Sequence, residues 1–255
     1  MKTNICIFIS IFFPLLVHGQ YNTWTKKSDF IAGKRERAVA FSIGDYGYIA
    51  TGVDTSETLL NDLWQYNPQL DTWTQKANLP GVARRDAIAF SVNGKGYVGT
   101  GMDNANALLG NKLKDLWEYD PNTNAWTQKA DFPGSGANGI YFATAFTVDN
   151  KGYVCGGKWG PSLYSNQLWE YKPSIDEWIQ RANFPPGVRY QLSSFSIGNE
   201  GYVGLGASQD VFKKDFYRYN YDVVLVDYRG FGKSVGKRTE QNLHDDMQYV
   251  YNHLK

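Results

Sequence analysis

Histidine, the side chain that most often binds metals and transfers protons, is scarce in this chain. Its three histidines are His18, His244 and His253, so a long central stretch has no imidazole to bind a metal or to transfer a proton. No two carboxylates stand at a spacing that indicates acid–base catalysis. We therefore expect no metal, no cofactor and no catalytic residue.

Two glycine-containing segments match nucleophile or phosphate motifs only in part. Residues 206–210 read Gly-Ala-Ser-Gln-Asp and lack the final glycine of the Gly-x-Ser-x-Gly turn. Residues 230–234 read Gly-Phe-Gly-Lys-Ser, but Asp227 replaces the earlier glycine of a phosphate loop. The helix that should follow such a loop directly is not expected there either. Neither segment predicts an active site.

The N-terminus has the pattern of a secretory signal peptide. Lys2 precedes an apolar run from Ile5 to Val17, and Gly19 ends the segment. The run is too short to cross a bilayer comfortably, so we expect cleavage after residues 1–19 and no membrane span afterwards. We expect a secreted protein, in the periplasm, at the cell surface or outside the cell.

The charge balance argues against nucleic-acid binding, and the cysteine content argues against a disulfide-stabilised fold. Removing residues 1–19 takes away one basic side chain, Lys2, and leaves basic and acidic residues balanced. That balance gives no electrostatic footprint for nucleic acid. Cys155 is then the only cysteine, so no intramolecular disulfide can brace the fold. We expect its thiol to be small, buried and unreactive.

An internal repeat organises the chain. The dipeptide Gly-Tyr recurs at intervals of 49, 56 and 49 residues, at Gly47-Tyr48, Gly96-Tyr97, Gly152-Tyr153 and Gly201-Tyr202. An apolar-aromatic pair follows each one, at Leu63-Trp64, Leu116-Trp117, Leu168-Trp169 and Phe216-Tyr217. Nine residues after the first three of these aromatic residues stand Trp73, Trp126 and Trp178. An arginine precedes a phenylalanine by six residues at Arg35, Arg84 and Arg189, whereas Ile140 replaces it in the third unit.

Each unit of about 50 residues predicts roughly four short strands. Turn residues such as Asn67-Pro68 separate the two tryptophans of a unit, which indicates a hairpin. Proline soon after the second tryptophan, as at Pro80, ends the outer strand. Four strands in about 50 residues is typical of one blade of a β-propeller.

These marks resemble the kelch-repeat family over residues 20–220. Members of that family pair a glycine-rich strand with a downstream Trp-x-Tyr hairpin and a closing tryptophan. The resemblance implies an all-β fold, a kelch-type propeller of about four blades in an incomplete or four-bladed ring. The family's glycine doublet is complete only at Gly156-Gly157. Some kelch-type propellers are copper oxidases, but residues 20–220 contain no histidine ligand for copper.

Trp159 is the one tryptophan outside the repeat positions. It follows a glycine-rich strand, and the matching loops of the other units carry Asp54, Asp103 and Asp210. Loops at equivalent places share one rim of a propeller, so these four residues are the candidate binding site for sugar or protein. The alternative is an ordinary loop tryptophan packed against its own blade.

The repeat ends near Asn220. Residues 221–255 read as a buried strand, a glycine loop and a helix from about Glu240, which is α/β architecture. This segment resembles a strand and helix of the α/β-hydrolase family around Asp227–Ser234, without its nucleophile, acid or histidine. The junction falls inside a blade, and we expect a chimera or a truncation product.

The N-terminal segment around Trp24 reads as a closing strand without a hairpin partner of its own. It can complete the fourth blade and close a four-bladed ring. If the ring stays open, the blade faces at its ends expose apolar surface that favours self-association.

The sequence thus favours a protein- or carbohydrate-binding or scaffold module over catalysis. The alternative is an enzyme, either a sugar mutarotase or epimerase on the propeller or a truncated serine hydrolase of which residues 221–255 are a remnant.

Overall fold

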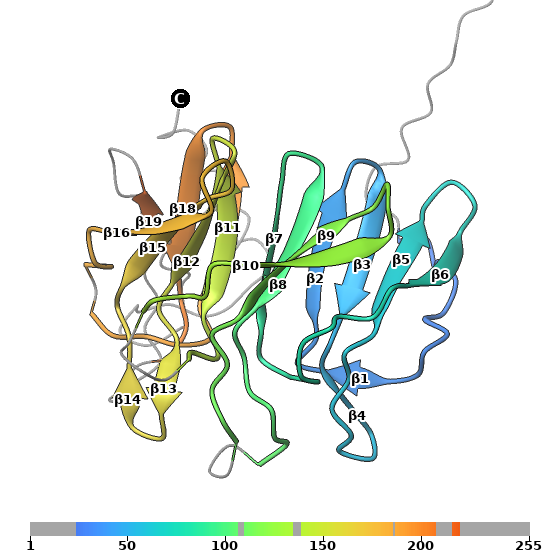
Figure 1. Ribbon diagram of the computed structural model, residues 1–255, viewed down its shortest axis with the longest axis horizontal. Helices are drawn as coiled ribbons and strands as arrows, with labels where there is room; N and C mark the ends of the chain where they lie inside the picture. The colour runs from blue at the N-terminus through green and yellow to red at the C-terminus, as the bar shows by residue number, and fades with distance from the viewer. Residues whose placement is uncertain (1–23, 107–109, 135–138, 186, 208–215, 220–255) are drawn as a thin grey trace, which may run out of the picture.

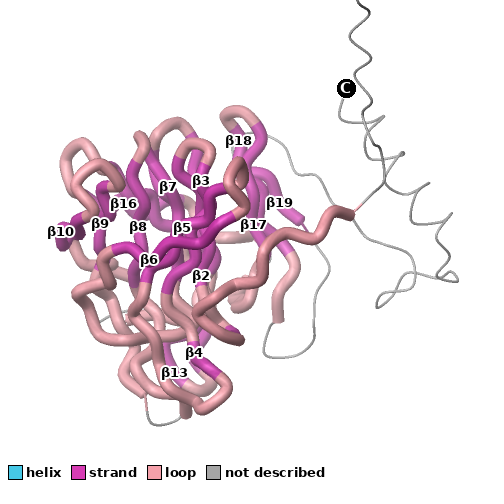
Figure 2. The backbone as a smooth tube through the Cα atoms, turned by 90° about the vertical axis from the view of Figure 1, so that its right-hand side faces the viewer, coloured by secondary structure: helices cyan, strands magenta, loops and turns pink. Residues whose placement is uncertain are grey.

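The chain is an all-β protein in the part that the structure describes. A computed structural model describes residues 24–106, 110–134, 139–185, 187–207 and 216–219. Strands joined by loops make up these residues, and no helix is found among them (Figure 2). The expected leader over residues 1–19, the hydrolase-like segment 221–255 and Asp210 lie outside the described residues.

Three consecutive antiparallel sheets have four strands each, and their strands follow the order of the chain (Figure 1). The first sheet contains β2 (Val39–Ile43), β3 (Tyr46–Ala50), β5 (Leu63–Asn67) and β6 (Thr72–Lys76). The second contains β7 (Ile88–Val92), β8 (Lys95–Gly99), β9 (Leu116–Asp120) and β10 (Ala125–Lys129). The third contains β11 (Thr144–Val148), β12 (Lys151–Cys155), β15 (Leu168–Lys172) and β16 (Glu177–Arg181).

The fourth sheet has three described strands. These are β17 (Ser193–Ile197), β18 (Glu200–Gly204) and β19 (Phe216–Tyr219). Two small ribbons lie at one end of the large sheets: β1 (Arg35–Glu36) with β4 (Val53–Asp54), and β13 (Lys158–Gly160) with β14 (Leu163–Tyr164). The four large sheets correspond to the four units of the sequence repeat.

The register places the same aromatic pair in every sheet. The tyrosine of each Gly-Tyr dipeptide lies opposite a phenylalanine of the preceding strand, and the two rings stack with centroids 5.0 to 5.2 Å apart. Stacked aromatic pairs add to the free energy gained by burying their surface. The pairs are Phe41–Tyr48, Phe90–Tyr97, Phe146–Tyr153 and Phe195–Tyr202.

The glycine of the dipeptide lets one sheet pack closely on the next. A Cβ atom placed on Gly96 would lie 2.3 Å from the Phe41 ring, and one on Gly152 would lie 2.2 Å from the Phe90 ring. Gly201 meets Phe146 in the same way, at 2.1 Å. Each phenylalanine therefore fills the space that the glycine of the following sheet leaves open. The buried clusters of the core follow these contacts from sheet to sheet.

A chain of backbone hydrogen bonds ties the sheets together beside their first strands. Asp86 N–H donates to the Arg37 carbonyl, Phe142 N–H to the Asp86 carbonyl, and Gln191 N–H to the Phe142 carbonyl. All four residues have a φ between 50° and 60°. The first strands β2, β7, β11 and β17 are neighbours in this order. Equivalent residues thus repeat around one line through the molecule.

The closing tryptophans join each sheet to the one before it. The Trp126 indole N–H donates to the Ala77 carbonyl at 2.8 Å, and the Trp178 indole N–H donates to the Ala130 carbonyl at 2.9 Å. Trp73 of the first sheet makes the same contact with the carbonyl of Ser28, at 3.5 Å. Ser28 therefore takes the place that an alanine after the outer strand takes elsewhere.

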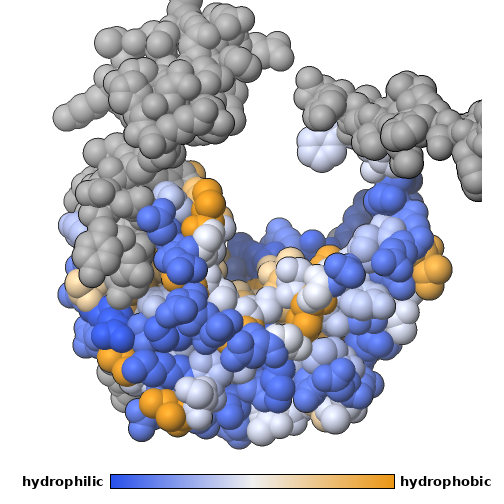
Figure 3. Space-filling model, turned by 90° about the horizontal axis from the view of Figure 1, so that it is seen from above, coloured by the Kyte–Doolittle hydropathy of each residue, from blue (hydrophilic) through white to orange (hydrophobic). Residues whose placement is uncertain are grey.

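The four sheets form an open arc. Seen from above, the described surface curves around a central hollow and leaves a gap between its two ends (Figure 3). No closed sheet is found among the described residues. The side chain of Trp24 is fully exposed, so it does not complete the fourth sheet in this structure.

The contact between Phe90 and Gly152 generates a prediction. Gly152→Ala should lower the free energy of unfolding by about 1–3 kcal/mol, because the new methyl group overlaps the ring of Phe90. In a Phe90→Leu background the added cost should be smaller, since the aromatic ring is gone. Urea unfolding of the two single variants and the double variant measures this coupling, and additive effects would contradict the proposed packing.

Candidate functional site

In the first three sheets, the loops that follow the second strand gather at one end of the molecule. The β1–β4 and β13–β14 ribbons lie at this end, at the bottom of Figure 1. Between them, Met102 forms isolated antiparallel β-bridges with Arg85 and with Lys112. The structure therefore places the loops of the first three sheets along one rim.

Behind this rim, the first two sheets repeat an arginine, an aspartate and a tryptophan. Arg84 donates to both oxygens of Asp115 at 2.6 and 2.7 Å, and the Trp117 indole N–H donates to Asp115 at 2.7 Å. The first sheet has the same arrangement, with Arg35, Asp62 and Trp64. Burial opposes ionisation of both carboxyl groups, but the bonds from arginine and tryptophan outweigh it and hold the pKa of Asp62 and of Asp115 below the usual value.

The third sheet has lost both members of this ion pair. Ile140 stands where the arginine is expected, and Gln167 stands where Asp62 and Asp115 stand in the first two sheets. Trp169 keeps its contact, because its indole N–H donates to the Gln167 side-chain oxygen at 3.1 Å. Ile140 replaces the positive charge and Gln167 replaces the negative charge. Because both charges are absent, neither is left buried without a partner.

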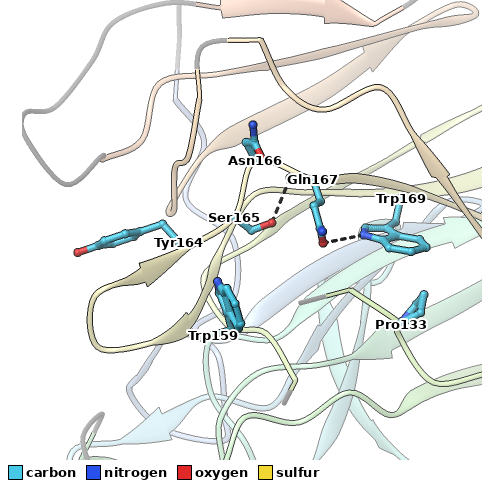
Figure 4. A pocket seen from close by; sticks show the side chains of 7 residues that line it. All are labelled: Pro133, Trp159, Tyr164, Ser165, Asn166, Gln167 and Trp169. Atoms are coloured by element: carbon cyan, nitrogen blue, oxygen red, sulfur yellow. Dashed lines mark hydrogen bonds between the residues drawn. The ribbon is translucent and has the colours of Figure 1, made fainter. Parts of the chain in front are cut away.

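A hollow opens at this altered position. It has a volume of about 470 Å³, within the usual range for small-molecule sites. Figure 4 shows Trp159 standing at one wall, with its indole nitrogen toward the Ser165 end of the hollow. The other lining residues are Pro133, Tyr164, Ser165, Asn166, Gln167 and Trp169.

Trp159 also lines a second hollow, on the side of the preceding sheet. This one has a volume of about 460 Å³ and is bordered by Asn111, Lys112 and Lys114. The half-buried Trp159 ring is therefore shared by two adjacent hollows. Its indole N–H is buried, and no acceptor for it is found in the described part of the chain. A buried donor without an acceptor costs free energy.

An aromatic cluster surrounds Lys158 beside Trp159. The Lys158 ammonium lies over the rings of Tyr190, Tyr164 and Tyr141, at 4.7, 5.0 and 5.9 Å from their centroids. The Tyr164 and Tyr190 rings stack on each other at 5.3 Å. Burial lowers the pKa of Lys158, while the negative ring faces favour its charged form.

Among the described residues, Asp86 is the one carboxyl group whose pKa is raised. Burial raises it to about 6, against the opposing effect of the Arg85 and Arg37 guanidinium groups. Arg85 is buried and donates a hydrogen bond to Asp86, and Arg37 lies 3.6 Å from the same oxygen atom. Arg37 also lies over the Phe142 ring at 5.8 Å.

The aspartates expected beside Trp159 serve their own loops. The Asp54 carboxylate accepts the backbone N–H groups of Ser56 and Thr58. The Asp103 carboxylate accepts the backbone and side-chain N–H groups of Asn111. Neither aspartate lines the two hollows around Trp159. Asp103 reaches the second hollow indirectly, because it positions Asn111 at its edge.

The sequence marks Trp159 as a candidate but not the polar residues around it. Ser165, Asn166 and Gln167 precede a repeat tryptophan and resemble an ordinary loop. Their sequence signal is a paired departure from the repeat, with Ile140 for arginine and Gln167 for aspartate. The arginine pattern described above predicts only the first of these two changes.

The cysteine thiol, metal ligation and membrane-spanning helices do not involve the two hollows. Cys155 is buried, and burial raises the pKa of its thiol to about 12, which disfavours a reactive thiolate. Among the described residues, no cluster of three or more histidine, cysteine, aspartate or glutamate side chains is arranged to hold a metal ion. The same part of the chain has no helix long and apolar enough to cross a membrane.

Comparison with known proteins adds information on the fold alone. No protein-family model and no curated protein matches the chain. A solved structure of a protein named YjhT is similar, with a TM-score of 0.65 and 19% sequence identity. The similarity covers 79% of this chain and 73% of YjhT. At this identity the similarity extends to the overall architecture and to no functional residue.

The exchange of an ion pair for Ile140 and Gln167 generates a prediction. Asp115→Asn should lower the free energy of unfolding at pH 7 by about 3 kcal/mol, because Arg84 is left buried without a carboxylate. Because the pKa of Asp115 is lowered by folding, this stabilisation is present above its unfolded pKa and is lost as the pH falls through the folded value. The difference between variant and parent should therefore shrink in acid.

The matched control copies the third sheet into the second. The double variant Arg84→Ile, Asp115→Gln should recover most of the loss, because no buried charge remains. Urea unfolding between pH 3 and pH 7 compares the three proteins. A double variant as unstable as Asp115→Asn at pH 7 would show that the ion pair itself is required.

Proposed function

We propose that this chain is a secreted, kelch-type β-propeller that binds carbohydrate in the two hollows around Trp159 and carries out no catalysis. The repeated kelch marks, the four sheets in repeat order and their open arc support the propeller. The signal-peptide pattern of residues 1–19 supports secretion.

The single observation that carries the binding proposal is the shared position of Trp159 between two polar hollows. An indole face packs well against the C–H face of a sugar ring. Around it, the Ser165 hydroxyl and the Asn166 and Gln167 amides offer donors and acceptors at one side, and Asn111 and two lysines offer them at the other. Few charges and several neutral polar groups around an aromatic wall suit a ligand that is rich in hydroxyl groups.

The concave shape favours a glycan over a folded protein partner. Protein interfaces need an extended patch with a buried apolar centre. Each hollow instead has the size of a site for one or two sugar rings, and the ring of Trp159 is accessible from two sides. A linear oligosaccharide that passes over Trp159 would contact both hollows.

Trp159 fluorescence tests this function. A panel of soluble oligosaccharides, neutral and acidic, should contain members that change the emission in a saturable way. Trp159→Ala should abolish binding of these members by isothermal titration calorimetry. Tyr46→Ala removes an exposed aromatic side chain on a strand outside the hollows and should leave the affinity unchanged.

A second variant fills the site without removing the tryptophan. Ile140→Arg with Gln167→Asp should rebuild the ion pair of the second sheet and bring charge to the wall of the hollow. We expect a loss of glycan affinity of at least tenfold with the fold preserved. Undiminished binding by both this variant and Trp159→Ala would overturn the assignment of the site.

One observation favours an enzyme as the second candidate, a sugar mutarotase or epimerase. Asp86 has a pKa of about 6 beside two arginines, which suits a group that gives and takes protons near neutral pH. Exchange of sugar anomers followed by NMR tests it. Acceleration that Asp86→Asn abolishes would favour the enzyme. Exchange at the uncatalysed rate would favour the proposed binding function without catalysis. The serine hydrolase alternative rests on residues 221–255, outside the described residues.

A further inference from the structure

The two ends of the arc carry complementary halves of the contact that joins the sheets. At the end formed by the fourth sheet, Phe195 and Ile197 are 46% and 61% exposed. The equivalent residues of the third sheet, Phe146 and Val148, are 4% and 3% exposed, because the fourth sheet covers them. The exposed face of the fourth sheet is therefore the face that each of the first three sheets buries against the next sheet in the chain.

The first sheet offers the opposite surface. Within the molecule, a Cβ on Gly96, Gly152 or Gly201 would collide with a phenylalanine of the sheet before. A Cβ on Gly47, the equivalent glycine of the first sheet, would meet nothing closer than the Tyr66 Cβ, at 3.8 Å. Gly47 thus keeps an open space of the kind that a phenylalanine fills at the three internal contacts.

The N-terminal segment has the sequence and the position of an outer strand of a preceding sheet. Residues 23–28 read Thr-Trp-Thr-Lys-Lys-Ser, close to Thr-Trp-Thr-Gln-Lys-Ala at residues 72–77. Ser28 already contacts Asp71 and Trp73 as Ala77 contacts Asn124 and Trp126 one sheet later. The end of this segment, at Ser28, therefore contacts the first sheet as the end of a preceding fourth strand does elsewhere.

The matching acceptor for a tryptophan of the fourth sheet is Ala182, which directly follows β16 of the third sheet. Ala77 and Ala130 each receive an indole N–H on their carbonyl and give their own N–H to a side chain of the next sheet. Ala182 is the third residue of this series, and it is exposed. None of the described side chains forms either contact with it.

From these observations we infer that a second copy of this chain docks head to tail on each end of the arc. Residues 24–27 of one copy add to β19 of the other as the fourth strand, and the Trp24 indole N–H donates to the Ala182 carbonyl. The exposed Phe195 and Ile197 then pack on Gly47 of the partner. The contact repeats the three internal interfaces, so its shape and polarity are already those of a stable interface.

The number of sheets indicates a dimer. Two copies that dock at both ends supply eight sheets, which is within the range of four to eight seen in closed propellers, whereas three copies would supply twelve. A head-to-tail contact forms a closed ring when the rotation at each interface completes a turn. Closure by one chain alone would require Trp24 to reach its own fourth sheet, but Trp24 is fully exposed in the open arc.

The test is the mass in solution of the full chain, produced with its leader so that export can process it. Light scattering after size exclusion should give twice the chain mass. Gly47→Leu fills the open space on the first sheet, and its Cβ meets its own chain only in ordinary contact with the Tyr66 Cβ at 3.8 Å. Ile197→Lys places a charge on the fourth sheet. Each should give monomers, while Leu70→Lys, an equally exposed position in a turn, should remain dimeric.

Mixing the two monomeric variants tests the head-to-tail geometry. The Gly47→Leu chain keeps an intact fourth sheet, and the Ile197→Lys chain keeps an intact first sheet, so an equimolar mixture should regain dimers through one interface. A symmetric dimer of two fourth sheets would not respond to Gly47→Leu, and one of two first sheets would not respond to Ile197→Lys. A monomeric parent chain at micromolar concentration, or dimers that both substitutions leave unchanged, would overturn the inference and favour closure within one chain.

Discussion

The packing of a phenylalanine from one sheet against a glycine of the next is the constraint on which the molecule depends. It sets how closely two sheets approach, because the phenylalanine ring occupies the space where the glycine has no side chain. A side chain at Gly96, Gly152 or Gly201 would push the sheets apart. The tryptophan and backbone hydrogen bonds between sheets form only at this separation.

The candidate site lies where the third unit differs from the repeat at two positions while the packing of phenylalanine on glycine is kept. In the first two sheets an arginine and an aspartate form an ion pair behind the rim, and the aspartate also accepts the indole N–H of a tryptophan. In the third sheet Ile140 and Gln167 remove both charges, and Trp159 stands beside the resulting hollow. Since a buried charge cannot remain alone, the two substitutions are tolerated only together. The repeat therefore serves as an internal reference against which a functional departure can be recognised.

Trp159 could be selected from the sequence because it is the one tryptophan outside the repeat positions. The role of Asp54 and Asp103 could not be read in the same way. A carboxylate in a loop either faces a ligand or accepts N–H groups of its own turn, and residue type does not distinguish the two. The structure shows the second arrangement for both. Likewise, the raised pKa of Asp86 depends on burial beside two arginines, one of them from another sheet.

The sequence by itself determined the all-β class, the four units and the residues that mark each strand, because period-two patterns and turn residues act over a few neighbours. It also marked Gly47 and Trp24 as members of the repeat. Only the tertiary structure decided which of these residues meet: that the arc stays open, that Trp24 is exposed and that Gly47 faces open space. Closure depends on the angle between successive sheets, and that angle is the sum of many side-chain contacts across their faces rather than a property of any one repeat.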